Sequence, residues 1–544
     1  MATLNFKGKP FVQNYHLSVK YHQLIPRKNK SLTKKVSLHD NLIIHGDNLK
    51  ALKALLPTYA GKIKCIYIDP PYNTGNEKWA YNDNVNSPMM QDWLGNIVDK
   101  EDLTRHDKWL CMMMPRLKLL RELLTENGVI FVSIDDNEQH RLRILMDLVF
   151  GEDNFVAQVI WQKVYSPRMD AKGYSMDHDH ILVYRRSEEY CVTPVPFEQN
   201  RAQFTELDGP TQKYYRRRSL RKEGKNSRKE DRPNLFYPLK APDGTDVLPI
   251  RPDGSEGCWR WASHRYEKAK SENLVEWVRT SDGWQVYVKQ FYNEYATRPP
   301  STMWPHSEVG HNHEANEEVK MILGASAFAD PKPARLIKHI LMLTTNDEDE
   351  DIVLDSFAGS GTMAHAVLAL NAEDGGNRRF ILVECEDYAD KITAERVRRV
   401  IKGVPKAKDE NLRNGLDGTF SYFDLGPPIE MESILSGDNF PSYTELARYV
   451  FYTATGEEFD PDAVDEKKNF IGQSAQYLVY LFYKPDMDYL KATALTLDRA
   501  KALGPYKKKR RLVFAPTKYL DQEHLDELRI DFAQLPFEIY QLVK

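Results

Sequence analysis

Two stretches of the sequence decide the fold: Lys64-Cys65-Ile66-Tyr67-Ile68-Asp69-Pro70-Pro71-Tyr72 and Ile352-Val353-Leu354-Asp355-Ser356-Phe357-Ala358-Gly359-Ser360-Gly361-Thr362. In each stretch, an apolar run typical of a buried strand leads directly into a loop that begins with an aspartate. Loops that follow the strands of an open α/β sheet lie at one edge of that sheet, where binding sites form. The two stretches therefore predict a sheet whose functional site comes from distant parts of the chain.

The apolar pattern around these stretches alternates between strand and helix, which is typical of βαβ units and a parallel sheet. It predicts strands over residues 42–44, 63–68, 128–134, 352–354 and 380–383, and helices over 48–56, 109–124, 333–343 and 363–370. Strand-like runs return over 477–483 and 511–514. We therefore expect an α/β domain in two halves, followed by a small α+β C-terminal domain.

The length of 544 residues is that of three to four domains, since a domain holds about 100–200 residues. Changes in composition predict an N-terminal arm (1–40), a first α/β half (41–183), an intervening module (184–313), a second α/β half (314–405) and a C-terminal domain (406–544).

The intervening module mixes Pro, Gly, charged and aromatic residues without a long apolar period. Basic side chains interleaved with aromatic ones suit phosphate contact and base stacking. The candidates for such contacts are Arg216, Arg217, Arg218, Arg221, Lys222, Trp259 and Arg260. A solvated loop with a few core tryptophans is an equally consistent interpretation, because charge runs are common on surfaces. The basic run over 507–511 likewise suits either DNA phosphates or a solvated hairpin tip.

The overall composition narrows the class of protein. Lys plus Arg number 75 against 79 Asp plus Glu, so any nucleic-acid surface must be local. The five cysteines form no C-x-x-C pair, which argues against a zinc site or a disulfide framework. His306, His311, His313 and Glu314 have a metal-like spacing, but a loop rich in His and Asn produces it by chance, and we expect no metal. The absence of a long apolar run and the polar start at 1–5 predict no membrane span and no signal peptide, and hence a cytoplasmic protein.

The Asp69-Pro70-Pro71-Tyr72 tetrapeptide suits the activation of an aromatic amine, whose lone pair is delocalised into its ring. Asp69 can accept one amine hydrogen and the Pro70 carbonyl the other, which turns the nitrogen lone pair toward an electrophile. The two prolines restrict the backbone and so set the carbonyl direction in advance. Tyr72 offers a flat face for the base, and a base in a duplex must flip out to reach it. A tight turn without chemistry is the alternative interpretation.

The glycine-rich turn at 355–362 lets the backbone approach a ligand closely, and a helix start follows it at Thr362. No lysine follows Gly361, so the turn is not a phosphate-binding P-loop. Glu384 ends the next predicted strand at the spacing of an acid that holds ribose hydroxyls. It could also be an exposed carboxylate at the end of a strand.

On these motifs the chain resembles the β-class of S-adenosylmethionine-dependent DNA amino-methyltransferases, and in particular the modification (Mod) subunit of Type III restriction-modification systems. Similarity spans nearly the whole chain, and the order of catalytic motif, recognition module and cofactor turn is that of the class. The resemblance implies a Rossmann-like class I methyltransferase domain, with a mixed, mainly parallel sheet and helices on both faces. A target-recognition domain, here 184–313, would interrupt it.

The resemblance also implies roles for individual residues. The catalytic set would be Asp69, Pro70, Pro71 and Tyr72. The set for S-adenosylmethionine would be Asp47, Lys332, Asp355, Phe357, Ala358, Gly359, Gly361, Thr362 and Glu384. Within it, Asp47 would contact the adenine of the cofactor, and Pro331-Lys332-Pro333 would lie beside its methionine end. The segments 232–237 and 532–537 are also similar to Mod proteins. Met363 departs from the usual threonine, with little expected consequence.

The activity implied is that of a site-specific, adenine-specific DNA methyltransferase that acts on N6, because Asp at position 69 is typical of adenine enzymes. Without a Pro-Cys dipeptide, a C5-cytosine mechanism has no nucleophile. Three alternatives stay open: a DNA-recognition subunit that mainly recruits a nuclease-helicase partner, an N4-cytosine methyltransferase, or an RNA methyltransferase. The family implies double-stranded DNA, a homodimer and a Res-type helicase-nuclease as partners.

Overall fold

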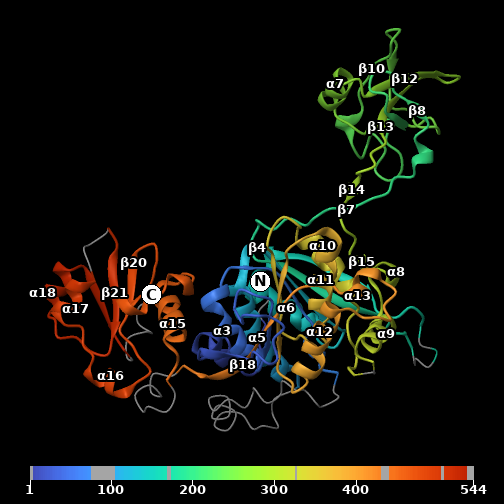
Figure 1. Cartoon of the computed structure of the whole chain (residues 1–544). Helices are drawn as coiled ribbons and strands as arrows, with labels where there is room; N and C mark the ends of the chain where they lie inside the picture. Colours follow the sequence, from blue (N-terminus) through green and yellow to red (C-terminus); the bar gives the residue numbers. More distant parts are fainter. Residues whose placement is uncertain are drawn as a thin grey trace. The chain divides into compact units, whose positions relative to one another are not determined.

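The structure is a computed structural model, and it describes residues 4–74, 105–167, 169, 173–324, 327–429, 440–503 and 508–535. The chain divides into two compact units, drawn in Figure 1. The main unit holds Met1–Thr193 and Ser301–Lys544, and the inserted unit holds Pro194–Pro300.

A ten-stranded sheet organises the main unit, in the order β1-β18-β2-β17-β16-β3-β4-β6-β5-β15. The six strands from β18 to β4 run parallel to one another, whereas β1 and β6 are antiparallel to their neighbours. This mixed, mainly parallel sheet confirms the expected fold class. The strands are β1 (His22–Pro26), β2 (Leu42–His45), β3 (Ile63–Ile68), β4 (Leu124–Ile134), β5 (Phe155–Gln162), β6 (His178–Arg185), β15 (Met303–Trp304), β16 (Ile352–Asp355), β17 (Arg379–Glu384) and β18 (Ser421–Pro428).

Two groups of helices accompany the sheet. In the first group α3 (Asn48–Tyr59) contacts α5 (Arg105–Leu123), which contacts α6 (Gln139–Phe150). In the second, α10 (Ala334–Thr344), α11 (Thr362–Asp374) and α12 (Glu395–Lys402) contact in that order, and α9 (Asn312–Leu323) packs on α12. Shorter helices are α1 (Lys9–Val12), α2 (Tyr15–Ser18), α8 (His306–Val309), α13 (Glu410–Asn414) and the π-helix Ala389–Ala394. No helix in the described part of the chain is long and apolar enough to cross a membrane.

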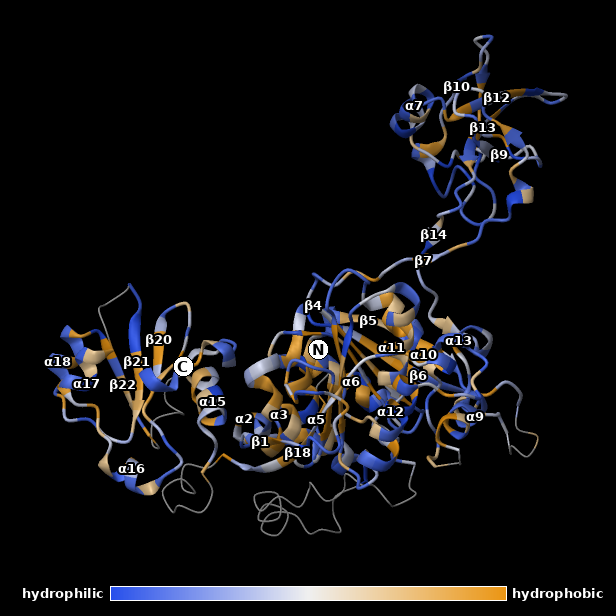
Figure 2. Cartoon of the chain, viewed as in Figure 1, coloured by the Kyte–Doolittle hydropathy of each residue, from blue (hydrophilic) through white to orange (hydrophobic). Residues whose placement is uncertain are grey.

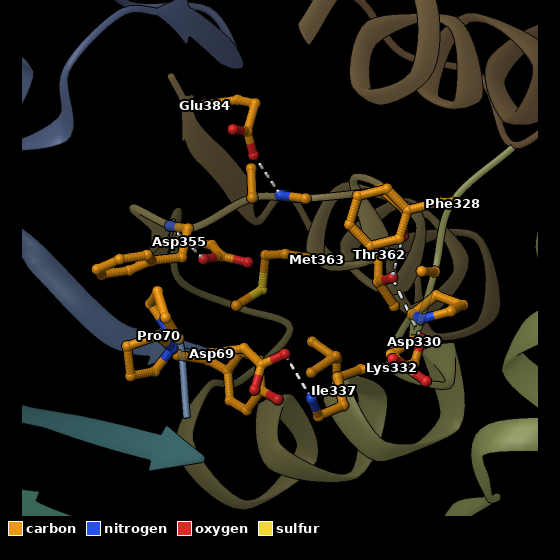
Figure 3. Close-up of a pocket in the computed structure, with 18 of the residues that line it drawn as sticks. Asp69, Pro70, Phe328, Asp330, Lys332, Ile337, Asp355, Thr362, Met363 and Glu384 are labelled. Carbon is orange, nitrogen blue, oxygen red and sulfur yellow. Dashed lines mark hydrogen bonds and ion pairs between the residues drawn. The ribbon is translucent and has the colours of Figure 1, made fainter. Parts of the chain in front are cut away.

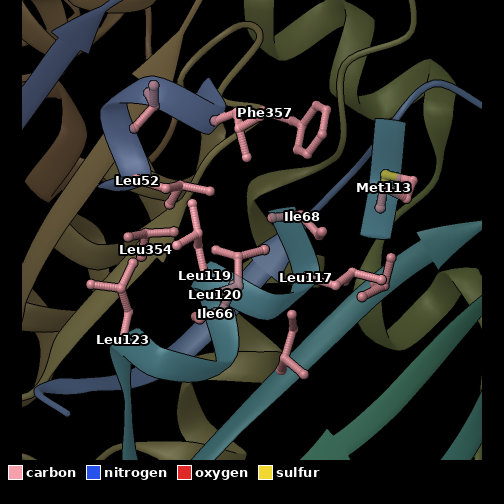
Figure 4. Close-up of a cluster of buried hydrophobic side chains, with 14 of the residues drawn as sticks. Leu52, Ile66, Ile68, Met113, Leu117, Leu119, Leu120, Leu123, Leu354 and Phe357 are labelled. Atoms are coloured by element: carbon pink, nitrogen blue, oxygen red, sulfur yellow. The ribbon is translucent and has the colours of Figure 1, made fainter. Parts of the chain in front are cut away.

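The core of the main unit lies between the sheet and α3, α5 and α6. Strand residues Ile66, Ile68 and Leu354 pack there against Leu117 and Leu120 of α5 (Figure 4). All five side chains are buried, and the apolar colour of the central strands in Figure 2 follows the same layer. The predicted apolar runs are therefore strands buried on both faces, as parallel sheets require.

Most sequence-based boundaries agree with the structure, and the differences have local causes. Strand β4 begins at Leu124 rather than at 128, because Leu124 already pairs with Ile63 of β3. The predicted arm at 1–40 contains β1, which pairs with β18 at the edge of the sheet. That edge strand makes part of the arm integral to the main unit.

The inserted unit is narrower than the module predicted at 184–313, because β6 runs to Arg185 and β15 pairs with β5 in the main sheet. It holds a four-stranded sheet in the order β12-β13-β9-β8, and its small core includes the buried Trp259. Strands β7 and β14 pair near its two ends. Its elements are β7 (Val195–Pro196), β8 (Glu206–Leu207), β9 (Tyr214–Ser219), β10 (Leu239–Lys240), β11 (Asp246–Val247), α7 (Ser263–Ser271), β12 (Val275–Thr280), β13 (Gly283–Phe291) and β14 (Thr297–Arg298).

The C-terminal part of the main unit has a four-stranded sheet of its own, in the order β19-β20-β21-β22. It begins later than the predicted residue 406, because β18 belongs to the large sheet. Of the basic run, Lys507 lies outside the described residues, Arg510 pairs with Asp531 and Arg511 is buried, which disfavours a phosphate-binding turn. Pro536 and Phe537 are also outside them. Its elements are α15 (Tyr443–Thr455), β19 (Phe470–Gln473), β20 (Tyr477–Leu481), α16 (Met487–Ala492), α17 (Leu497–Ala502), β21 (Arg510–Ala515), α18 (Gln522–Glu527) and β22 (Ile530–Gln534).

Candidate active site

The two stretches that decide the fold meet at one edge of the sheet. Strands β3 and β16 are parallel neighbours, so the loops that follow Ile68 and Asp355 lie side by side. Between these loops is a cavity of about 310 Å³. Figure 3 shows Asp69 and Lys332 on one side of this cavity and Glu384 on the other. Its lining includes Asp69, Pro70, Pro71, Tyr72, Lys332, Asp355, Phe357, Ala358, Gly359, Thr362 and Glu384.

Asp69 is held by partners on both of its carboxylate oxygens. Its Oδ1 accepts a hydrogen bond from the Tyr72 hydroxyl at 2.9 Å, and its Oδ2 forms an ion pair with Lys332 Nζ. Lys332 also lies 5.2 Å from the centroid of the Tyr72 ring. The predicted catalytic acid is therefore oriented and charge-compensated inside the cavity.

Tyr72 reaches a second carboxylate that the sequence analysis did not identify. Its hydroxyl lies 3.4 Å from Oδ2 of Asp179, a residue of β6 that is 2% exposed. Lys163 Nζ donates to the other oxygen, Oδ1, at 2.6 Å. Burial raises the pKa of Asp179, against the opposing charges of Lys332 and Lys163. Burial beside Asp69 and Asp179 also raises the pKa of Tyr72 well above its usual value, so the phenol stays protonated and acts as a donor.

The backbone after Asp69 is anchored from α5. The indole Nε1 of the buried Trp109 donates to the Pro71 carbonyl at 2.7 Å. Asn73 follows in a left-handed conformation with φ 57°, and its side chain donates to the buried Glu138. No donor from the described residues reaches the Pro70 carbonyl, which leaves that oxygen for a ligand. The Pro71 carbonyl is thus fixed by a hydrogen bond, and the Pro70 carbonyl is available as an acceptor.

The glycine-rich turn is built around the end of β16. Asp355 Oδ1 accepts a hydrogen bond from the Phe357 amide at 2.9 Å, which starts the turn. Gly359 and Gly361 then have φ values of 51° and 80°, which favour glycine. Thr393 of the π-helix donates to the Gly359 carbonyl at 2.6 Å. These contacts hold the turn open toward the cavity at the start of α11.

Two buried acids line the cavity beside the glycine-rich turn. Glu384 is 2% exposed; its Oε2 accepts from the Gly359 amide at 2.7 Å, and its Oε1 from the Glu386 amide at 3.0 Å. Burial raises the pKa of Glu384, and burial raises the pKa of Asp355 to about 8. Glu384 is therefore no exposed strand-end carboxylate, but a fixed acceptor beside the glycine turn.

A buried arginine supports the turn from α12. Arg396 donates from Nη1 to the hydroxyls of Ser360 and Thr362, each at 2.9 Å. Its Nη2 forms an ion pair with Glu318 at 2.9 Å, and the side chain is fully buried. The Thr362 hydroxyl in turn donates to the Lys332 carbonyl at 3.2 Å. Arg396 thereby connects the glycine-rich turn to the loop that carries Lys332.

Asp47 does not line the cavity. Its side chain caps α3 by accepting from the Lys50 amide at 3.0 Å, and Arg116 Nη2 lies 3.8 Å from its Oδ2. The adjacent Gly46 amide donates to the Glu384 carbonyl at 2.9 Å, so Asp47 follows the strand next to Glu384. Its expected contact with the cofactor adenine stays a prediction.

The candidate DNA-contacting residues differ in their surroundings. Trp259 is 2% exposed and packs in the core of the inserted unit, so it is not a surface for base stacking. Arg217 pairs with Glu276 at 2.8 Å. Arg216 donates to Gln290, Arg221 to the Ile250 carbonyl, and Arg260 to the Ser219 carbonyl. Arg218 is exposed and Lys222 is half-buried. Within the described part of the chain, neither side chain forms an ion pair or a hydrogen bond.

Several site residues escaped sequence analysis: Phe328, Tyr388, Trp109, Lys163, Asp179 and Arg396. Their signals are weak, because each is an isolated residue outside any motif until the fold brings it to the site. Among the metal-like histidines, His311 caps α9 and His306 contacts Gln162. A second group consists of Asp136, which follows β4, and of His178 and His180 at the start of β6; the His180 ring forms hydrogen bonds with Asp136 and Gln158.

Comparisons with known proteins show which family the chain is similar to. A family model described as DNA methylase, of the N6/N4 methyltransferase type, matches residues 63–395. The Type III restriction-modification enzyme EcoPI Mod subunit of Escherichia phage P1 is 31% identical over 74% of this chain and 68% of its own. The Type II methyltransferase M.KpnI of Klebsiella pneumoniae is 32% identical over 62% of this chain and 79% of its own.

Among solved structures, a putative DNA modification methylase from Thermus thermophilus, complexed with S-adenosyl-L-methionine, aligns with a TM-score of 0.30. That alignment has 15% identity and covers 66% of this chain and 95% of the other.

Proposed function

The chain belongs to the N6/N4 DNA methylase family, and from this we propose that it transfers a methyl group from S-adenosylmethionine to the N6 amine of an adenine in DNA. The observation that carries the proposal is the shared cavity, in which Asp69-Pro70-Pro71-Tyr72 and the glycine turn face each other. A methyl-transfer enzyme needs an amine site and a cofactor site in contact, because the transfer is direct.

The residues of the glycine turn fit the cofactor. A nucleoside with two ribose hydroxyls needs a fixed acceptor, and Glu384 keeps its carboxylate at the cavity wall with backbone amides on both oxygens. The left-handed Gly359 and Gly361 allow the backbone to lie close to a ligand. Phe328 and Tyr388 add aromatic lining. When bound, S-adenosylmethionine supplies an electrophilic methyl group on a sulfonium.

The catalytic residues act by positioning and by hydrogen bonding. Asp69 and the Pro70 carbonyl would each accept one amine hydrogen of the base, which holds the nitrogen lone pair toward the methyl donor. Hydrogen bonds to Asp69 strengthen as positive charge develops on the amine, so they stabilise the transition state more than the ground state. Trp109 limits movement of the acceptor pair by holding the Pro71 carbonyl. A base stacked on Tyr72 would complete the site.

The similarity to Type III Mod subunits supports a role as the modification subunit of a restriction-modification system, with double-stranded DNA as substrate. The inserted unit would then read the target sequence. Arg218 and Lys222 are its first candidates for phosphate contact, because neither side chain has a charged or hydrogen-bonding partner within the described part of the chain. A homodimer and a Res-type helicase-nuclease are further parts of this proposal. Light scattering of the purified chain, alone and with a co-expressed Res subunit, tests both.

Transfer of a labelled methyl group from S-adenosylmethionine to unmethylated genomic DNA tests the function. Digestion to nucleosides identifies the labelled base. We expect label in N6-methyladenine, and none with Asp69→Ala, which should still bind DNA. Label in N4-methylcytosine would overturn the choice of base, and label in RNA alone the choice of substrate. Methylation by the variant at the wild-type rate would remove Asp69 from the mechanism.

A further inference from the structure

Asp69 must accept a hydrogen from the target amine, yet both of its oxygens are already engaged. Oδ2 pairs with Lys332, and Oδ1 accepts the Tyr72 hydroxyl at 2.9 Å. A carboxylate oxygen that already holds one hydrogen bond is a weaker acceptor for a second. Release of one of the two partners therefore strengthens the hydrogen bond that Asp69 can accept from the amine.

Tyr72 is the partner that has a second acceptor within reach. Its hydroxyl lies 3.4 Å from Asp179 Oδ2, so a small movement transfers its one hydrogen bond from Asp69 to Asp179. The Lys332 side chain, in contrast, is 11% exposed and has no acceptor other than Asp69 among the described residues. Moving Lys332 would leave a cation without its partner in a largely buried place, which costs more than rotating a phenol.

Asp179 is already positioned to accept a hydrogen bond from the Tyr72 hydroxyl. It is 2% exposed, and Lys163 holds its other oxygen at 2.6 Å. The backbone of Lys163 is held as well, since its amide donates to the Asp177 carbonyl at 3.0 Å and its carbonyl accepts from the Asn312 amide at 3.0 Å. A carboxylate fixed on one oxygen and turned toward Tyr72 with the other is preorganised as an acceptor.

We propose that Asp179 is a positioning residue for methyl transfer: it accepts the Tyr72 hydroxyl when the target base enters, and so frees Asp69 Oδ1 for the amine of the base. Lys163 keeps Asp179 oriented for this exchange. No bond other than hydrogen bonds changes, and the protons stay on the phenol and the amine. The inference rests on the proposed function and adds a specific role for the Asp179–Lys163 pair.

A double-mutant cycle tests the exchange. Asp179→Asn keeps the size of the side chain but replaces a charged acceptor with a neutral one, and Tyr72→Phe removes the hydroxyl while keeping a ring for the base. In the wild-type background we expect Asp179→Asn to lower kcat by roughly 10- to 100-fold, the worth of a charge-assisted hydrogen bond. In the Tyr72→Phe background Asp69 is already free, so the same substitution should change kcat by less than about 2-fold, the spread expected between uncoupled sites.

Readouts other than kcat separate positioning from folding. The KM for S-adenosylmethionine should stay at the wild-type value in Asp179→Asn. Its thermal unfolding temperature should fall because Lys163 loses a charged partner, but by the same amount in both Tyr72 backgrounds, unlike kcat. Asp177→Asn, a carboxylate two residues away whose side chain contacts Ser175, is the matched control and should leave kcat unchanged. If Asp179→Asn does not fold, Lys163→Met enters the same cycle, and its cost should likewise vanish with Tyr72→Phe.

The outcomes separate the two proposals. Equal losses of kcat in both backgrounds would show that Asp179 acts independently of Tyr72, and would overturn the exchange while leaving DNA methylation intact. Absence of methylation by the wild-type chain would refute the proposed function, and the exchange with it. A loss confined to the background that contains the Tyr72 hydroxyl supports the exchange.

Discussion

Replacing Arg396 with Met should destabilise the main unit and weaken cofactor binding together. The guanidinium is fully buried and makes contacts of 2.9 Å with Glu318, Ser360 and Thr362. Removing one partner of a buried ion pair costs about 3–5 kcal/mol. The lower end applies, because the Glu318 side chain is 21% exposed and water can reach it.

A loss of about 3 kcal/mol corresponds to a fall in Tm of roughly 6–12 °C, on the scale of domains of 150–250 residues. Differential scanning fluorimetry measures it, and calorimetric titration with S-adenosylmethionine measures the weaker cofactor binding that a loosened Ser360–Thr362 turn should cause. Arg399→Met is the matched control on the same helix: the Arg399 side chain is 44% exposed in its pair with Glu395. A surface pair of this kind contributes no more than about 1 kcal/mol.

The double variant Arg396→Met with Glu318→Leu supplies the decisive comparison. Replacing both members of a buried ion pair with apolar side chains is often neutral, so the double variant should recover most of the lost Tm. A double variant as unstable as Arg396→Met, or an Arg396→Met protein with wild-type Tm, would refute the reasoning from the buried charge.

Three further predictions follow from single contacts. Trp109→Phe removes the donor to the Pro71 carbonyl, and it should lower kcat without changing the affinity for the cofactor. Trp304→Phe is the control: it loses a similar hydrogen bond to the Ser301 carbonyl and should leave kcat unchanged. Equal kcat in both variants would contradict the anchoring role of Trp109. Gly361→Ala should weaken cofactor binding more than Gly375→Ala. Both glycines have φ near 80°, but only a Cβ at Gly361 meets the Thr393 carbonyl oxygen, at 3.0 Å. Equal affinities in the two variants would show that this contact does not affect cofactor binding. Burial raises the pKa of Asp355 to about 8, so the folded protein keeps a proton that the unfolded chain releases above its ordinary value near 4. The Tm of the wild type relative to that of Asp355→Asn should therefore fall as pH rises from about 4 to about 8, and a constant difference would contradict the burial argument.

The sequence predicted the sheet because its central strands are short apolar runs buried on both faces. It also predicted which loops meet, because Asp69 and Asp355 both follow strands of one parallel sheet. It did not predict Asp179, which belongs to a strand that the helical and strand periods did not single out. Tertiary packing alone brings this residue within reach of Tyr72.

Composition was a poor guide to exposure in the inserted unit. Trp259 and Arg217 share a basic and aromatic context, yet the tryptophan is a core residue and the arginine is paired with Glu276. A run of charge and aromatics does not reveal which side chains a small sheet buries, because a strand sends neighbouring residues to opposite faces. Strand β9 shows this: Tyr215 is buried, whereas its neighbours Tyr214 and Arg216 are exposed and half-buried, respectively.

The glycine-rich turn and Asp69 are parts of one network of contacts. Arg396 holds Thr362, the Thr362 hydroxyl donates to the Lys332 carbonyl, and the Lys332 side chain pairs with Asp69. A displacement of the glycine-rich turn should therefore move Lys332, the counter-ion of Asp69, although the two motifs are far apart in the sequence. For this reason the Arg396→Met substitution should lower kcat at saturating cofactor as well as cofactor affinity, whereas a turn that acted only as a binding surface would change affinity alone.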